Sequence, residues 1–347
     1  MKWNLASFAV QAEAGCSAIE TTCDDSGTPG EAWGSRRARG PAVLGENALP
    51  QEQRRGPDSM ERRDFLRAST FAAAAVVLGR GVRAQDEWVT KQPVKLKGRI
   101  KHSVSRWCYG GIELDTLCRE VAAMGALSVE LLDEPDWGVP AKHGLVCAIA
   151  NGPGSITRGW NRVEHHGELL SKSESMLPKI AAAKIPNTIV FSGNRSGQPD
   201  AEGVKHCIAG LKKLAPLAER HEVTVLFEIL NSKVDHADYQ FDHMAYGLEV
   251  VKAVGSPRLK ILYDIYHAQI MEGDVVRTIN KNLEWIGHFH TGGVPGRNEI
   301  DASQELNYAA ICKAIADARF QGYVGQEFVP TGDPMESLRA AIAICDV

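Results

Sequence analysis

Residues 223–236, which read Val-Thr-Val-Leu-Phe-Glu-Ile-Leu-Asn-Ser-Lys-Val-Asp-His, contain the pattern that decides the fold. The first five residues are mostly apolar and rich in β-branched side chains, which is typical of a strand buried on both faces. Glu228 ends this strand, and polar residues follow it. A buried carboxylate is costly unless it is paired or binds a cation. We therefore expect Glu228 to belong to a polar site at the end of a buried strand.

The same arrangement recurs in the strands that follow along the chain. Three further apolar runs each carry an acid or an imidazole near the carboxyl end: Leu259–His267 with Asp264, Ile286–Thr291 with His290, and Tyr323–Val329 with Glu327. A lone carboxylate at the end of a strand is more often part of a salt bridge in a loop than a ligand. Four such residues in consecutive strands favour one shared site.

The chain from residue 95 to 347 alternates between predicted strands and helices. The remaining strands are predicted at Ile100–Tyr109, Leu127–Leu132, Leu145–Ala150 and Thr188–Ser192. Helices are predicted at Leu114–Met124, Val139–His143, His166–Lys184, Asp200–His221, Phe241–Val254, Val275–Leu283, Leu306–Ala316 and Asp333–Ile344. Eight such units over about 250 residues are typical of a closed (β/α)8 TIM barrel, an α/β fold. An open doubly wound sheet is the alternative, although no G-x-G-x-x-G turn follows a predicted strand.

In a barrel, the carboxyl ends of all strands face one mouth. We therefore expect Glu228, Asp264, His290 and Glu327 to converge on one divalent metal ion. Three oxygen ligands and one nitrogen ligand favour Mg²⁺ or Mn²⁺, with Co²⁺ as a further candidate. Zinc would be more expected with several His or Cys ligands.

The predicted metal site suits chemistry on a hydroxy-carbonyl compound. Such a compound can bind a metal through both oxygens, and the metal would stabilise the enediolate that forms when the adjacent carbon loses a proton. Glu228 and Glu327 come from different sides of the barrel, so they form the natural pair to remove and return that proton.

Two further residues are candidates for the same mouth. Glu130 on the second strand is predicted to orient a ligand or contact a substrate, with an internal salt bridge as the alternative. His288 points to the same side of its strand as His290, because side chains alternate with period two. His288 is therefore a candidate substrate contact, although one of these two histidines could instead be a hydrogen-bonded core residue.

Composition excludes several other classes of protein. The 347 residues are 44% hydrophobic and 24% charged, with a net charge of −4, which gives no basic surface for nucleic acid. The eight cysteines form no C-x-x-C pair, which argues against a structural zinc site.

The N-terminal segment differs from the rest. Residues 1–59 lack periodicity and are predicted to be disordered or to be an extension upstream of the true start. Residues 60–84 resemble a twin-arginine export signal, with Arg62-Arg63 before an apolar run that is too short for a stable membrane anchor. We expect a protein exported to the periplasm, or a cytoplasmic one with a helical arm if the signal is not used.

Four motifs carry a family resemblance. Glu228–His236, Asp264–His267, Val294–Tyr308 and Gly325–Phe328 resemble hydroxypyruvate isomerases, which belong to the xylose isomerase-like TIM barrels. The resemblance covers residues 95 to 347. It implies metal binding and proton transfer by the two glutamates, substrate contacts from His267 and Arg297, and a tendency to form homo-oligomers.

One departure concerns the metal ligands. Hydroxypyruvate isomerases usually carry Gln where this chain has His290, and Gly287–Thr291 resembles the ketose 3-epimerases instead. Those epimerases have a further Glu where this chain has Val234. The best prediction is conversion of hydroxypyruvate to tartronate semialdehyde.

The rivals are a ketose 3-epimerase or dehydratase acting on a sugar, which export would favour, and a carbohydrate-binding barrel without turnover. An abasic-site endonuclease on the same fold would need several metals, many His ligands and a basic face.

Overall fold

The computed structural model describes residues 94–347. The predicted extension (residues 1–59) and the predicted export signal (residues 60–84) lie outside the described residues.

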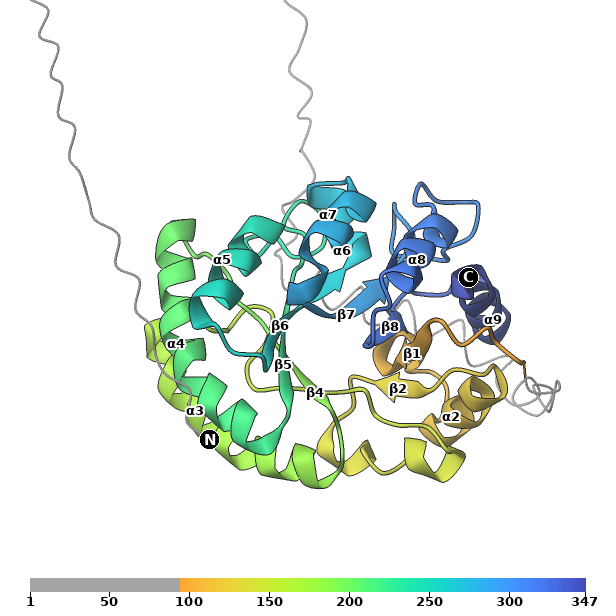
Figure 1. The fold of residues 1–347 in the computed structure, drawn as a ribbon, viewed down its shortest axis with the longest axis horizontal. Helices are drawn as coiled ribbons and strands as arrows, with labels where there is room; N and C mark the ends of the chain where they lie inside the picture. Colours follow the sequence, from red (N-terminus) through yellow and green to blue (C-terminus); the bar gives the residue numbers. More distant parts are fainter. Residues whose placement is uncertain (1–93) are drawn as a thin grey trace, which may run out of the picture. The chain divides into compact units, whose positions relative to one another are not determined.

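The described residues form an eight-stranded parallel sheet that curves into a nearly closed barrel (Figure 1). In the sheet the strands follow the order β2-β1-β8-β7-β6-β5-β4-β3. Isolated parallel bridges, Ser128–Val146 and Leu132–Ala150, join the β2 and β3 ends of that order. The barrel prediction is confirmed and the open doubly wound sheet is wrong. The strands are β1 Lys101–Ser105, β2 Ser128–Glu130, β3 Ile149–Ala150, β4 Asn187–Val190, β5 Thr224–Glu228, β6 Leu259–Asp264, β7 Ile286–Thr291 and β8 Tyr323–Gln326.

Helices surround the strands in a ring (Figure 1). They are α2 Leu114–Ala123, α3 Val163–Ala182, α4 Asp200–His221, α5 Met244–Val254, α6 Ile265–Met271, α7 Val275–Asn282, α8 Tyr308–Asp317 and α9 Pro334–Cys345. The bounds predicted for α4 are confirmed. The predicted helix at Val139–His143 is only a short 3-10 turn, Pro140–His143, which proline opens and Gly144 closes at φ 73°.

Five of the strands end earlier than the sequence predicts, and the first and the sixth show the reason. The first stops at Ser105, and a 3-10 turn, Arg106–Tyr109, takes over. The sixth stops at Asp264, whose carboxylate accepts a hydrogen bond from the backbone N–H of His267 (3.0 Å) and so caps α6. His267 therefore lies on a helix that begins at the rim of the barrel, and the prediction of a strand to His267 is wrong.

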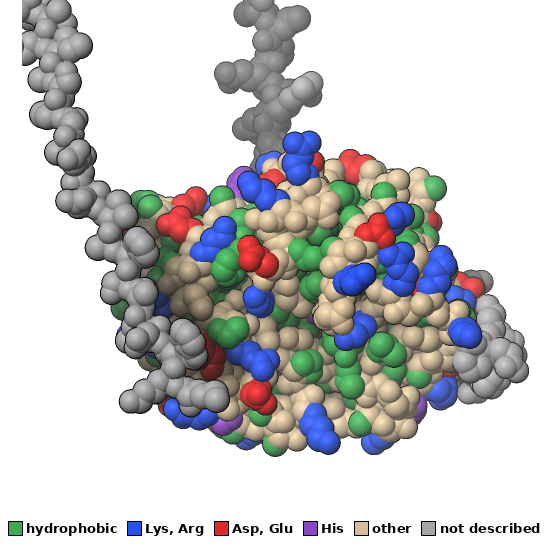
Figure 2. Space-filling model, in the orientation of Figure 1, with side chains coloured by type: hydrophobic (Ala, Val, Ile, Leu, Met, Phe, Trp, Pro, Cys, Tyr) green, Lys and Arg blue, Asp and Glu red, His purple; other side chains and the backbone are tan. Residues whose placement is uncertain are grey.

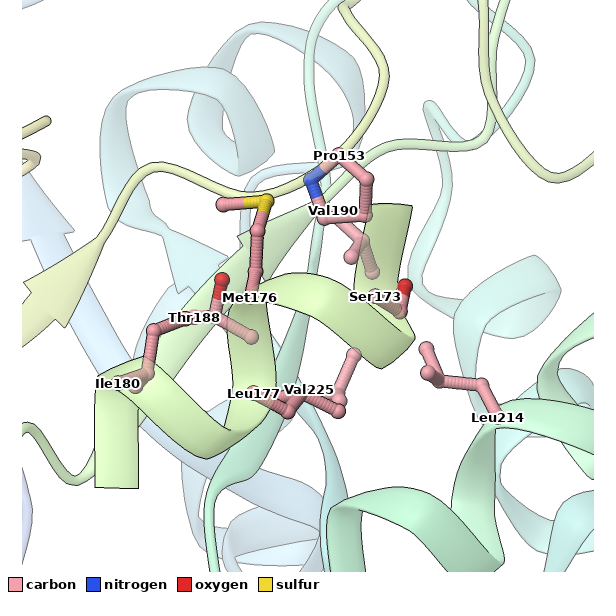
Figure 3. A pocket seen from close by; sticks show the side chains of 9 residues that line it. All are labelled: Pro153, Ser173, Met176, Leu177, Ile180, Thr188, Val190, Leu214 and Val225. Atoms are coloured by element: carbon pink, nitrogen blue, oxygen red, sulfur yellow. The ribbon is translucent and has the colours of Figure 1, made fainter. Parts of the chain in front are cut away.

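The helices pack on the barrel through apolar faces. Figure 3 shows one such contact, where Met176 and Leu177 of α3 approach Thr188 of β4 and Val225 of β5. A void of about 10 Å³ remains there, which is about the space that one water molecule needs. This void is a packing feature of the wall and too small to bind a substrate.

The outer surface is mixed in character. On the face drawn in Figure 2, basic, acidic and apolar side chains are interspersed. Among residues 94–347, no helix combines the length and the apolar character that crossing a membrane requires.

Candidate metal centre

The four strand-end residues lie together in the structure. Glu228, Asp264, His290 and Glu327 are all buried, and each offers a ligand atom within 4.8 Å of those of the other three. The register of the sheet explains part of this, because Asp264 on β6 lies beside His290 on β7. Glu228 ends β5, and Glu327 directly follows β8. The barrel thus brings together four side chains that are separated by up to 99 positions in the sequence.

The imidazole of His290 lies at the centre of this cluster. Its Nδ1 atom is 2.6 Å from Glu327 Oε2 and 3.1 Å from Glu228 Oε1. Burial by itself would lower the pKa of His290, but the surrounding carboxylates hold it well above its usual range. The two distances show that Nδ1 is the ring nitrogen that faces the cluster.

The carboxylates respond to the same environment in different ways. Burial raises the pKa of Glu228 to about 7 and that of Asp264 to about 6, and the neighbouring carboxylate of Glu327 adds to both shifts. Burial acts on Glu327 too, but His290 and Arg297 outweigh it and hold the Glu327 pKa well below its usual range. Three buried carboxylates that meet at one point repel one another unless a cation balances their charge. The donor set therefore fits a divalent cation.

Arg297 closes one side of the cluster. Its Nη2 atom donates to Asp264 Oδ2 (2.8 Å) and to Glu327 Oε2, and its Nη1 atom contacts the Nε2 atom of His267. The guanidinium also lies 5.0 Å from the ring centroid of Tyr266. The structure thus brings both predicted substrate contacts, His267 and Arg297, next to the candidate ligands.

Glu130 and His288 lie behind the cluster. Glu130 Oε1 is 2.9 Å from His290 Nε2 and 3.1 Å from His288 Nε2. Burial would raise the pKa of Glu130, but the two imidazoles outweigh it and lower the pKa to about 2. Both side chains are fully buried, and neither lines the cavity described next. This geometry does not support their predicted contact with a substrate. It does support a role of Glu130 in orienting the candidate metal ligand His290.

A cavity of about 500 Å³ opens above the cluster at the mouth of the barrel. Glu228, His267, Arg297 and Glu327 line it together with His236. The carboxylates at its base can reach a bound molecule, so the site can combine metal coordination with proton transfer.

Two further residues shape this site. Trp107, for which the sequence favours core packing over a wall for a small substrate, is 49% exposed at the mouth, and its Nε1 atom donates to Glu327 Oε1 (2.6 Å). Gly325 on β8 leaves room for Glu130, because a Cβ atom there would lie 2.2 Å from Glu130 Oε1. Its position two residues before Glu327 is the signal that could have pointed to it.

Comparisons with known proteins agree with the barrel fold. The family model described as xylose isomerase-like TIM barrel matches residues 141–345, more than half of the chain. The chain belongs to this family. The resemblance to hydroxypyruvate isomerases is supported by a Xenopus laevis protein named "Putative hydroxypyruvate isomerase", which is 32% identical over 262 residues, or 74% of this chain and 92% of that protein.

Two further similarities complete the comparison. A Homo sapiens protein of the same name is 30% identical over 131 residues, which cover 38% of this chain and 47% of that protein, so this match spans about half of the human relative. A solved structure of an AP endonuclease, family 2, from Brucella melitensis is 25% identical with a TM-score of 0.63, and the match covers 69% of this chain and 97% of that one.

Proposed function

We propose that this family member is a metal-dependent isomerase of a small hydroxy-carbonyl compound that works by proton transfer through an enediolate. Hydroxypyruvate, converted to tartronate semialdehyde, is the first substrate to test. One observation carries the proposal: four buried side chains of the types that bind metals, two of them glutamates, converge at the base of a substrate-sized cavity. The names of the relatives point to the same chemistry.

The metal would be held by Glu228, Asp264, His290 and Glu327. Three oxygen donors and one imidazole favour Mg²⁺ or Mn²⁺, with Co²⁺ as an alternative. When bound, a divalent ion polarises the carbonyl of the substrate and stabilises the negative charge that develops on its oxygens.

The protein's own groups would move the protons. One of the two glutamates, Glu228 or Glu327, removes a proton from carbon 3 of hydroxypyruvate, and a proton is returned to carbon 2. The hydroxyl proton on carbon 3 leaves as the oxygen on carbon 2 gains one, so atoms and electrons balance. Arg297, whose Nη2 and Nη1 atoms contact Asp264 and His267, lines the cavity and would hold the substrate carboxylate, while His267 would contact a hydroxyl group.

Proton NMR in D₂O tests this proposal. The full chain is loaded with Mg²⁺ and offered hydroxypyruvate and a panel of ketohexoses. We expect metal-dependent conversion of hydroxypyruvate with deuterium entering the product, and at least a hundredfold slower rate for Glu327→Gln with an unchanged circular dichroism spectrum. An unchanged rate in Glu327→Gln would show that Glu327 does not transfer the proton.

A ketose 3-epimerase or a related sugar isomerase or dehydratase is the second candidate. The observation that favours it is His290, which contacts both proton-transfer candidates from within the cluster. Val234, where an epimerase would have a glutamate, is 68% exposed and does not line the cavity. Deuterium at carbon 3 of a ketohexose, with hydroxypyruvate inert, would select this candidate. If deuterium enters none of the compounds tested, a carbohydrate-binding barrel without turnover would be favoured.

We also infer export, which rests on Arg62-Arg63 and the apolar run after them. Cell fractionation of the full chain and of the R62K/R63K double variant tests it. We expect periplasmic protein for the parent chain and cytoplasmic protein for the double variant. Equal distribution of the two would contradict export by this route.

A further inference from the structure

The mouth of the barrel has two chemically different halves. The charged residues come from β5 to β8 and the loops after them. The opposite half comes from β2 to β5 and presents hydrocarbon. Its lining residues are Leu131, Ile156, Ile189, Phe191 and Leu230.

This apolar half is partly open to the cavity. Leu131, Ile156 and Phe191 are only partly buried and Trp107 at its border is half exposed, whereas Ile189 and Leu230 are buried. Leu131 also adopts φ 59°, which is unfavourable for a side chain of this size. Unfavourable backbone of this kind is concentrated at functional sites. Apolar side chains are thus partly exposed at the mouth of the barrel, and one of them is kept there by an unfavourable backbone conformation.

Few polar groups interrupt this half. Asn151 is the polar side chain that lines the cavity there, and its Nδ2 atom already donates to Asp133 Oδ1 (2.9 Å). Hydroxyl groups that enter such a surface lose water without gaining partners, which is costly. An alkyl or aryl group gains about 25 cal/mol for each Å² of apolar surface removed from water.

The volume leads to the same conclusion. Hydroxypyruvate has seven heavy atoms, whereas pockets of about 300–1,000 Å³ enclose most of the surface of drug-sized ligands. The cavity measures about 500 Å³ and lies within that range. A three-carbon substrate bound at the cluster would therefore leave the apolar half of the cavity filled with water against hydrocarbon.

Resting on the isomerase function proposed above, we propose that the substrate is a hydroxy-carbonyl compound that carries an alkyl or aryl substituent. The hydroxy-carbonyl end occupies the charged half beside Glu228 and Glu327. The substituent lies against Ile156 and Phe191 on the opposite half, with Trp107 at its border.

Binding of hydroxamates to the Mn²⁺-loaded full chain tests this inference without turnover. Acetohydroxamate, hexanohydroxamate and the polyhydroxylated erythronohydroxamate share one chelating group and differ in the attached chain. A buried methylene contributes about 0.8 kcal/mol, or about fourfold in affinity. By isothermal titration calorimetry we expect hexanohydroxamate to bind at least tenfold more tightly than acetohydroxamate, and erythronohydroxamate to gain less than threefold.

Variants locate the effect. Phe191→Ser and Ile156→Ser are expected to reduce the hexanohydroxamate-to-acetohydroxamate affinity ratio at least fivefold. Val163→Ser, an exposed apolar position on α3 outside the cavity, serves as the control and should leave the ratio unchanged. Thermal melting of each variant confirms that the fold is retained.

The outcomes separate this inference from the proposed function. Acetohydroxamate binding with no dependence on chain length, or tighter binding of erythronohydroxamate, would overturn the apolar substituent and leave the isomerase proposal standing. Failure of every hydroxamate to bind the metal-loaded protein would overturn both.

Discussion

At the residue scale, Glu130 determines how the central histidine is presented. It contacts the Nε2 atom of His290 and leaves Nδ1 facing the cluster. Carboxylates behind a metal-binding histidine fix its orientation, and their loss typically weakens metal binding 10- to 100-fold.

We therefore expect Glu130→Gln to lower Mn²⁺ affinity by roughly that factor, measured by competition with a chelator. Glu120→Gln on α2, another buried glutamate, is the control and should leave the affinity unchanged. Equal affinity in the parent chain and Glu130→Gln would show that Glu130 does not position His290.

Glu299 connects the loop that carries Arg297 to the loop after β8. Its Oε1 atom accepts hydrogen bonds from the backbone N–H groups of Thr331 (2.7 Å) and Gly332 (3.1 Å). Burial would raise the pKa of Glu299, but these donors outweigh it and lower the pKa to about 2.

A lowered pKa gives a definite pH dependence. The ionised Glu299 stabilises the folded state fully above the unfolded-state pKa of 4.5, and this stabilisation is lost as the pH falls toward 2. We expect Glu299→Gln to lower the melting temperature at pH 7, and the difference from the parent chain to shrink at pH 3. Glu284→Gln is an exposed control. A difference that stays constant with pH would contradict the assignment.

The candidate ligands could be predicted residue by residue because each one ends an apolar strand. The bond from Trp107 to Glu327 joins residues that are 220 positions apart, and the sequence carries no sign of it. Glu130 was recognisable as a buried acid, but its partners His288 and His290 lie on β7, which two strands separate from β2 in the sheet.

At the scale of elements, Gly325 on β8 makes room for the side chain of Glu130, which reaches across from β2 past the intervening β1. A Cβ atom at Gly325 would lie 2.2 Å from Glu130 Oε1 and 2.9 Å from His290 Cδ2, so any side chain there displaces both. Overpacking of this kind typically costs about 1–3 kcal/mol.

We expect Gly325→Ala to lower the free energy of unfolding by about that amount and to weaken Mn²⁺ binding, as measured by denaturant titration and chelator competition. Gly138→Ala, where a Cβ atom meets nothing within 4 Å, should change the stability by less than about 0.5 kcal/mol. Equal stabilities of the two variants would show that β2 and β8 adjust freely.

The elements themselves were predictable to different degrees. The long amphipathic helix Asp200–His221 has the predicted bounds, since many turns contribute to its pattern. The predicted strand Leu145–Ala150 shrinks to Ile149–Ala150, and a single bridge at Val146 remains of its first half. Strand ends at the mouth depend on caps and turns, such as Asp264 at α6, which hydrophobic pattern alone does not reveal.

At the scale of the whole molecule, closing the barrel creates the site. Eight strand–helix units predicted the fold, and the fold predicted which strand ends would meet. The division of the mouth into a charged and an apolar half could not be predicted in the same way. Ile156 and Phe191 lie outside the strands, and a sequence pattern does not indicate which way loop side chains point.

The central claim is that Glu228, Asp264, His290 and Glu327 hold one divalent ion. Anomalous diffraction from a crystal of the Mn²⁺-soaked protein tests it most directly. We predict one strong peak about 2.1 Å from each of these side chains, with Nδ1 as the histidine ligand. A peak held instead by Glu130, His288 and His290, which form a second potential metal-binding group, would contradict the account. A cluster without manganese at saturating metal would contradict it as well.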